Sequence, residues 1–250
     1  MKIWEKLAVT AITESAEIVL NKGISALVIC SDVAPHSFTT ETISIWVEKA
    51  GKNIDIAKEM LVKDLVALGT YAEDIIQSNA TLATIANCDL TQDAGYIVLS
   101  ESETIKFKLR NLDASKIYEL HGLEAFFPST GVNKYERKSM GSEDVSRDFD
   151  VKGYDLASLQ KDNSITEISL THENGSVAKY TQFELEVMAR SADSANVIAD
   201  GVIKVSQTNR IVFPVHQIVN VNIRKEPGTR LDFSLRIDEN DYIRYQMPAK

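Results

Sequence analysis

The stretch Phe107-Lys108-Leu109-Arg110 returns 126 positions later as Phe233-Ser234-Leu235-Arg236. In both copies apolar and polar residues alternate, which is the period of a half-buried β-strand. Each copy is followed by an isoleucine beside a tyrosine, at Ile117-Tyr118 and Tyr242-Ile243. Because each copy closes about one half of the chain, we interpret the sequence as one β-domain used twice. Chance similarity between short alternating runs is the competing explanation.

Two earlier matches extend the repeat toward the N-terminus. Glu17–Leu20 resembles Glu167–Leu170, and Ile43–Val47 resembles Phe183–Val187. The offset between matched strands shrinks from 150 to 140 and then to 126 positions. The first half must therefore contain residues that the second half lacks.

A change of period identifies these extra residues. After Gly51 the apolar positions recur at helical spacing, at Ile56, Met60, Leu61, Leu65 and Leu68. Asp55 is a plausible N-cap of this helix, and Gly69 is placed to end it. The sequence predicts a helical insertion within residues 55–77.

The whole pattern predicts an all-β protein with a short inserted helical segment. Residues 1–14 are expected to form an N-terminal arm and residues 15–127 the first β-sandwich. Residues 128–164 are poor in periodicity and rich in charge, serine and glycine, so they are expected to form a linker. Residues 165–250 would be the second sandwich, and Asn174-Gly175 predicts a tight hairpin within it.

Composition excludes several classes of function. The chain has 250 residues, a net charge of −9 and no basic cluster, which disfavours direct binding to nucleic acid. No apolar run is long enough for a signal peptide or a membrane span, so we expect synthesis and assembly in the cytoplasm. Cys30 and Cys88 lie among apolar or small residues and are expected to be buried thiols.

Motifs for catalysis are missing from the sequence. The four histidines have no second ligand at metal spacing, and no nucleophile elbow or glycine-rich phosphate loop is present. We therefore expect no enzyme, no catalytic residue and no cofactor. Asp238-Glu239-Asn240-Asp241 crowds oxygen ligands into one turn, so Asp238, Glu239 and Asp241 are candidate calcium ligands. A solvated turn is the favoured interpretation, because a glycine pivot and a distal glutamate are missing.

Trp4 is the most suggestive side chain near the N-terminus. An indole on a short arm can anchor the arm to a partner or to a membrane interface. Lys2 and Lys6 flank it. The alternative is that the arm folds back onto its own domain.

At this point the sequence resembles the double jelly-roll major capsid proteins of tailless, membrane-containing icosahedral bacteriophages, and corticovirus-like and finnlakevirus-like members most. The likeness rests on the order and spacing of strands over most of the chain, without a diagnostic motif. The residues that carry it are Glu17–Leu20, Ser25–Cys30, Ile43–Lys49, the helix Val62–Leu68, Thr104–Arg110, Ile117–Glu124 and Phe233–Arg236.

The resemblance implies two jelly-roll β-sandwiches in tandem and a homotrimer that forms a pseudo-hexameric capsomer. These capsomers would contact neighbouring capsomers in a virion shell over an internal membrane, with the N-terminal arm on the membrane side. No contact with nucleic acid is implied. The alternative is a non-enzymatic β-sandwich binding module, either carbohydrate-binding or part of a phage tail or baseplate.

Overall fold

The computed structural model describes residues 1–8, 10–49, 52–71, 76–192 and 207–239. The first half of the described chain holds these strands: β1 (Lys2–Lys6), β2 (Ile18–Leu20), β3 (Ala26–Ser31), β4 (Thr42–Lys49), β5 (Lys52–Leu61), β6 (Thr84–Asp89), β7 (Thr104–Arg110) and β8 (Tyr118–Leu123). The second half holds β9 (Val132–Met140), β10 (Ser146–Asp150), β11 (Leu156–Gln160), β12 (Ile165–His172), β13 (Val177–Tyr180), β14 (Arg210–Pro214), β15 (Ile218–Lys225) and β16 (Leu231–Glu239).

The helical segments that lie wholly within the described residues are η1 (Pro35–Ser37), α1 (Val62–Gly69) and α2 (Gln182–Ala192). In the described residues no helix is both long enough and apolar enough to cross a membrane.

Both halves of the chain have the same strand order. The first half forms the sheet β1-β8-β3-β6 and the set β2-β7-β4-β5. If the second half is counted from β9, its strands show the same two orders, β9-β16-β11-β14 and β10-β15-β12-β13. Two four-stranded sheets in this order make an eight-stranded jelly roll. The expected fold class, all-β with two jelly-roll sandwiches in tandem, is confirmed.

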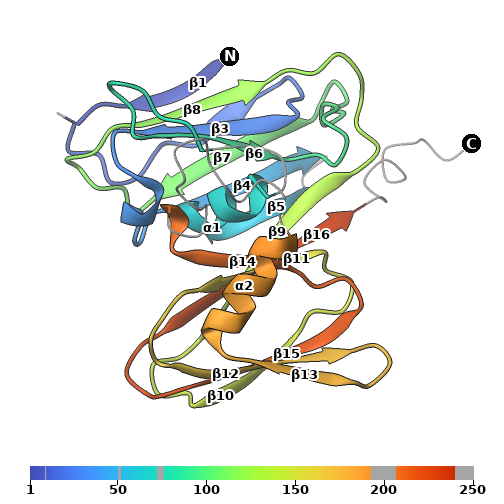
Figure 1. Ribbon diagram of the computed structural model, residues 1–250. Helices are drawn as coiled ribbons and strands as arrows, with labels where there is room; N and C mark the ends of the chain where they lie inside the picture. The colour runs from blue at the N-terminus through green and yellow to red at the C-terminus, as the bar shows by residue number, and fades with distance from the viewer. Residues whose placement is uncertain (9, 50–51, 72–75, 193–206, 240–250) are drawn as a thin grey trace, which may run out of the picture.

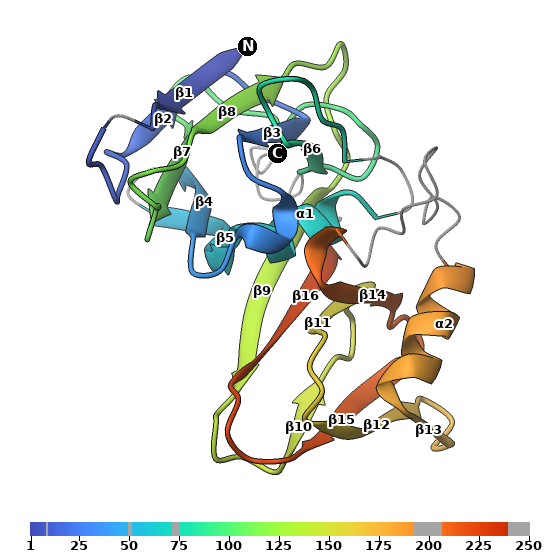
Figure 2. The same cartoon turned by 60° about the vertical axis from the view of Figure 1, so that its left-hand side comes forward.

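The two sandwiches are joined edge to edge. β5 and β9 pair in parallel at Ala57 and Tyr135, which fuses one sheet of each sandwich into an eight-stranded sheet. All the other named strand pairs are antiparallel. Figures 1 and 2 show two lobes in contact, with α1 at their junction and α2 on the flank of the second lobe.

Each lobe has its own apolar core, built by the inward residues of alternating strands. Phe107 is fully buried in the first core and Phe233 in the second. Tyr135 of β9 and Leu156 of β11 also belong to the first core. The second half of the chain therefore helps to close the first sandwich. Cys30 and Cys88 are buried free thiols, as expected.

The residue matches within the repeat are wrong, although the duplication holds. Phe107 lies in the seventh strand of its half and Phe233 in the eighth. Glu17–Leu20 covers the second strand, whereas Glu167–Leu170 lies in the fourth. Alternating strands resemble one another whatever their place in the sandwich, so strand similarity could not fix the register of the repeat.

The segment Phe183–Val187 was expected to be a strand, and it lies in helix α2. Glu184 accepts a bond from the backbone of Thr181 at 2.8 Å, and the Thr181 hydroxyl accepts one from the Glu184 N–H at 3.2 Å. This reciprocal pair is a capping box. α2 follows the fifth strand of its half just as α1 follows β5, so a helix at this place is common to both halves.

Three other boundaries also change. Residues 55–61 belong to strand β5, so the first helix begins at Val62 and Asp55 does not cap it; residues 72–75 of the expected insertion lie outside the described residues. The expected linker 128–164 contains β9, β10 and β11, all paired in the second sandwich. The expected arm 1–14 contains β1, the edge strand beside β8. The Asn174-Gly175 hairpin between β12 and β13 is confirmed, with Gly175 at φ +83°.

Candidate assembly surfaces and the groove at the seam

A buried ion pair holds the two sandwiches together. Asp64 lies on α1 and Arg210 begins β14; both side chains are 0% exposed, and the Arg210 Nε donates to the Asp64 carboxylate. The Ser234 hydroxyl of β16 donates to the other Asp64 oxygen at 2.7 Å. An ion pair in a dry interior resists changes of geometry, because a separated charge would be left unsolvated. The pair therefore fixes α1 against the second sandwich.

A second contact reinforces this seam. Arg236 of β16 donates to the Asp155 carboxylate at 2.9 Å through Nε, and its Nη1 lies 3.4 Å from the Leu68 carbonyl at the end of α1. Burial raises the pKa of Tyr135 at the same junction, which keeps its hydroxyl protonated. That hydroxyl donates to the Asp89 carbonyl. The seam is thus a packed polar interface within one chain.

Sequence reasoning missed Asp64 and Arg210. At helical spacing Asp64 falls on the same face as Leu68. An acid beside apolar residues on one face was a usable signal for a buried partner. Nothing local marked Arg210, which is 146 positions away.

The three predicted contact residues lie in β1 and not on a free arm. Lys6 is buried and its ammonium donates to the carbonyls of Ala114 at 3.0 Å and Lys116 at 2.8 Å. Burial lowers the pKa of Lys6. Its expected role as an exposed contact is therefore wrong, because its ammonium is bound by internal carbonyls. Trp4 is half-buried against the first core, which is the fold-back alternative.

Lys2 is the one predicted contact residue with a substantially exposed side chain. It is 42% exposed and lies 2.9 Å from Glu5 and 3.4 Å from Glu119. A partner contact at Lys2 or Trp4 stays a prediction.

The predicted calcium turn falls at the edge of what the structure describes. The backbone of Asp238 and Glu239 ends β16, while their side chains and Asp241 lie outside the described residues. In the part of the chain that is described, no group of three or more histidine, cysteine, aspartate or glutamate side chains could hold a metal ion.

Among the exposed large apolar side chains of the described residues, two groups lie close together in the sequence. Leu123 is the last residue of β8, and Phe126 and Phe127 follow it. Phe126 is fully exposed at 103%. Phe183 and Val187 form an i, i+4 pair on the outer face of α2 and are 70% and 43% exposed. Exposed apolar groups of this size are typical of interaction surfaces.

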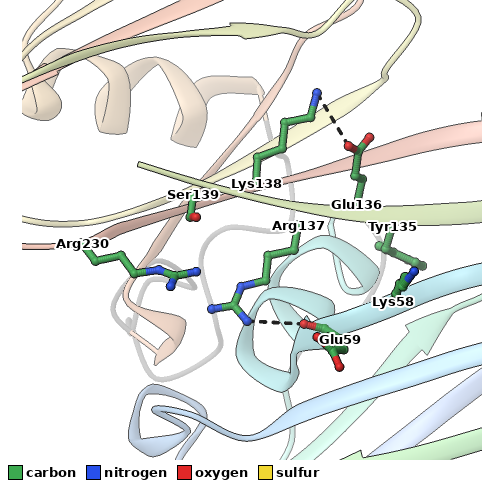
Figure 3. Close-up of a pocket in the computed structure, with 8 residues that line it drawn as sticks. All are labelled: Lys58, Glu59, Tyr135, Glu136, Arg137, Lys138, Ser139 and Arg230. Carbon is green, nitrogen blue, oxygen red and sulfur yellow. Dashed lines mark hydrogen bonds and ion pairs between the residues drawn. The ribbon is translucent and has the colours of Figure 1, made fainter. Parts of the chain in front are cut away.

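An open groove of about 360 Å³ lies where β5 and β9 separate, and Figure 3 shows its lining. Four cationic side chains contribute to it from β5, β9 and the loop before β16. Arg137 is held by Asp232 at 2.9 Å and by the Glu59 carbonyl at 3.4 Å. Glu59 itself has a positive φ of 46°. The lining residues are Lys58, Glu59, Tyr135, Glu136, Arg137, Lys138, Ser139 and Arg230.

No protein-family model matches the sequence, and no curated protein matches it. Among solved structures, the crystal structure of the major capsid protein P2 from bacteriophage PM2 is similar, with a TM-score of 0.53 at 10% sequence identity. The match covers 89% of this chain and 90% of that chain. The two chains share a fold.

The crystal structure of the mavirus major capsid protein also matches, at a TM-score of 0.33 and 9% identity, over 100% of this chain and 92% of that chain. This second likeness is too low to carry an argument.

Proposed function

We propose that this chain is the major coat subunit of an icosahedral virus particle and that it acts without catalysis or a cofactor. The observation that carries the proposal is the repeat of one jelly-roll strand order in two sandwiches, fused through one sheet. The similar solved chain, of which the match covers 90%, is named as the major capsid protein P2 from bacteriophage PM2.

The double sandwich suits a trimeric capsomer. Three copies contribute six sandwiches of similar outline, which approximates a hexagon and can tile a closed shell. Association around a closed threefold axis satisfies every subunit's contact surfaces without leaving free ends. The seam contacts at Asp64 and Arg236 support this role, because a rigid subunit presents its flanks at fixed angles.

The exposed apolar side chains are the candidate contacts between copies. Phe183 and Val187 on α2 and Phe126 beyond β8 would be covered by neighbouring subunits in an assembled shell. Burial of aromatic and aliphatic groups is the main favourable term in such association.

We further propose a place in the virion capsid of a corticovirus-like or finnlakevirus-like phage, with synthesis in the host cytoplasm. In such a particle the shell would surround an internal membrane, and Lys2 and Trp4 would be the contacts nearest to it. The net charge of −9 supports a coat that does not touch the genome. A sugar-binding module is less favoured. The chain has two tryptophans, Trp4 and Trp46, and Trp4 is packed on the first core, so it is not free to stack on a sugar.

Sedimentation velocity of the full-length protein across the micromolar range tests the proposal. We expect a species of three times the chain mass of 27.8 kDa, or closed shells, that persists on dilution. A protein that sediments only as a monomer at every concentration would overturn the coat function. Flotation with vesicles of anionic lipid tests the membrane contact separately, and Lys2→Glu should weaken it while leaving the trimer intact.

A further inference from the structure

Among the described residues, the edge of β9 that faces the groove is unpaired at Arg137 and Ser139. β9 pairs with β16 without a register break from Val132 to Met140. The Asn133 N–H donates to the Leu90 carbonyl at 3.0 Å, so it points away from β16. In an antiparallel strand the backbone groups of successive residues point to alternate sides. The backbones of Arg137 and Ser139 therefore also point away from β16.

In the part of the chain that the structure describes, no second strand pairs with these two residues. Among the described residues, β5 pairs with β9 only at Tyr135, and no backbone partner on the groove side is found for Arg137 or Ser139. Two N–H donors and two carbonyl acceptors thus face the groove, spaced as in a strand. Such an edge can accept an extended peptide as an additional strand.

The charge in the groove selects the kind of peptide. Arg137 is neutralised by Asp232, and the Lys138 ammonium donates to the Asp150 carbonyl at 3.0 Å. Lys58 is exposed, and Arg230 is 59% exposed with its Nε 3.7 Å from Asp232. Arg230 therefore shares the Asp232 carboxylate with Arg137. The two other carboxylates of the lining, Glu59 and Glu136, are bound by Arg110 and by the Tyr154 hydroxyl, so the cations of the groove are in excess. Carboxylates are the groups that they would attract.

We propose that this groove binds an extended acidic segment of a partner protein by strand addition to β9. The backbone of Arg137 and Ser139 pairs with the segment, while Lys58 and Arg230 receive its carboxylates. Main-chain bonds supply affinity in this mode and side-chain contacts supply selectivity. The inference does not depend on the coat function. The competing role of the same cations is to keep a free edge from pairing, and that role predicts no binding.

Fluorescence anisotropy with the full-length protein distinguishes the two roles. The probe is a fluorescein-labelled six-residue peptide that alternates valine and glutamate. We expect saturable binding that weakens as salt is raised. The same peptide with lysine in place of glutamate, or with a central proline, should not bind. Binding that is absent up to millimolar peptide, or equal for the lysine peptide, overturns the proposal.

Charge reversal locates the site. Arg230→Glu should weaken binding at least about tenfold, as loss of a charge-assisted contact would. Lys22→Glu is the matched control, because Lys22 is 58% exposed and also pairs with one carboxylate, and it should leave binding unchanged. Lys58→Glu provides a second variant if Arg230→Glu fails to fold. Equal losses in the groove and control variants would refute the site.

Amide exchange tests the backbone part of the proposal directly. Hydrogen–deuterium exchange followed by NMR should show that the peptide slows exchange at the Arg137 and Ser139 amides. The Glu136 and Lys138 amides point toward β16 and should not change. Protection spread over distant strands instead would contradict strand addition.

Discussion

Asp64 and Arg210 are the residue pair on which the union of the two sandwiches depends most. Both are fully buried, and removal of one partner strands the other charge in an apolar interior. We predict that Arg210→Met or Asp64→Leu alone lowers the free energy of unfolding by about 3–5 kcal/mol. The double variant should lose much less than the sum of the two. Urea unfolding measures all three proteins, and simple additivity would show that the pair is not coupled.

Asp93 makes the folding stability of the protein depend on pH. Burial raises the pKa of Asp93, but hydrogen bonds from the 129–130 turn and from the Gly95 N–H outweigh it and lower the pKa to about 2. The unfolded value is about 3.9. The carboxylate therefore adds stability above pH 4, and that stability is lost as the pH falls from about 4 to about 2.

The variant Asp93→Asn isolates this effect. Melting temperature against pH should be flatter for the variant than for the wild type between pH 4 and pH 2, and the two curves should run parallel at higher pH. Curves that stay parallel down to pH 2 would mean that Asp93 does not hold the loop.

Among the elements, β1 is where the structure departs most from the prediction, because residues predicted to form a free arm form a paired strand. A free arm could be removed without cost, whereas β1 pairs with β8, buries Lys6 and packs Trp4 on the first core. We predict that deletion of residues 1–6 lowers the melting temperature by several degrees, because each kcal/mol lost costs about 2–4 °C in a chain of this size. An unchanged melting temperature would show that residues 1–6 form a free arm that does not contribute to the stability of the sandwich.

Strands with one face in a core and one in water were predictable. Of the segments that carry the resemblance, Ile43–Lys49 lies within β4 and Thr104–Arg110 coincides with β7. Elements whose buried residues do not alternate with exposed ones could not be predicted from the sequence pattern. β9 runs along the seam and the groove, so Lys134, Arg137 and Lys138 obscured its pattern. In α2, Phe183, Leu185 and Val187 imitate a strand, yet only Leu185 is buried.

The candidate sites were harder to predict than the strands. The groove exists because β5 and β9 separate after one pairing, which is a tertiary event without a local signature. The Asp64–Arg210 pair joins positions in different halves of the chain. The N-terminal contacts were predicted from a tryptophan between two lysines on an expected free arm. That local pattern could not show that the Lys6 ammonium donates to internal carbonyls.

In the whole molecule, two similar sandwiches form one block. The shared eight-stranded sheet and the polar seam restrict motion of one lobe against the other. A block of this kind can be repeated around a threefold axis to give six nearly equivalent corners. A two-domain chain with a flexible linker could not hold that outline.

Negative-stain electron microscopy of the purified full-length protein tests whether the chain assembles into threefold capsomers. Class averages should show threefold particles with six sandwich-sized lobes arranged as a hexagon, or shells built from them. A stable closed oligomer stays assembled at micromolar concentrations. If the averages at such concentrations show only isolated two-lobed particles, the proposal of a threefold capsomer is contradicted.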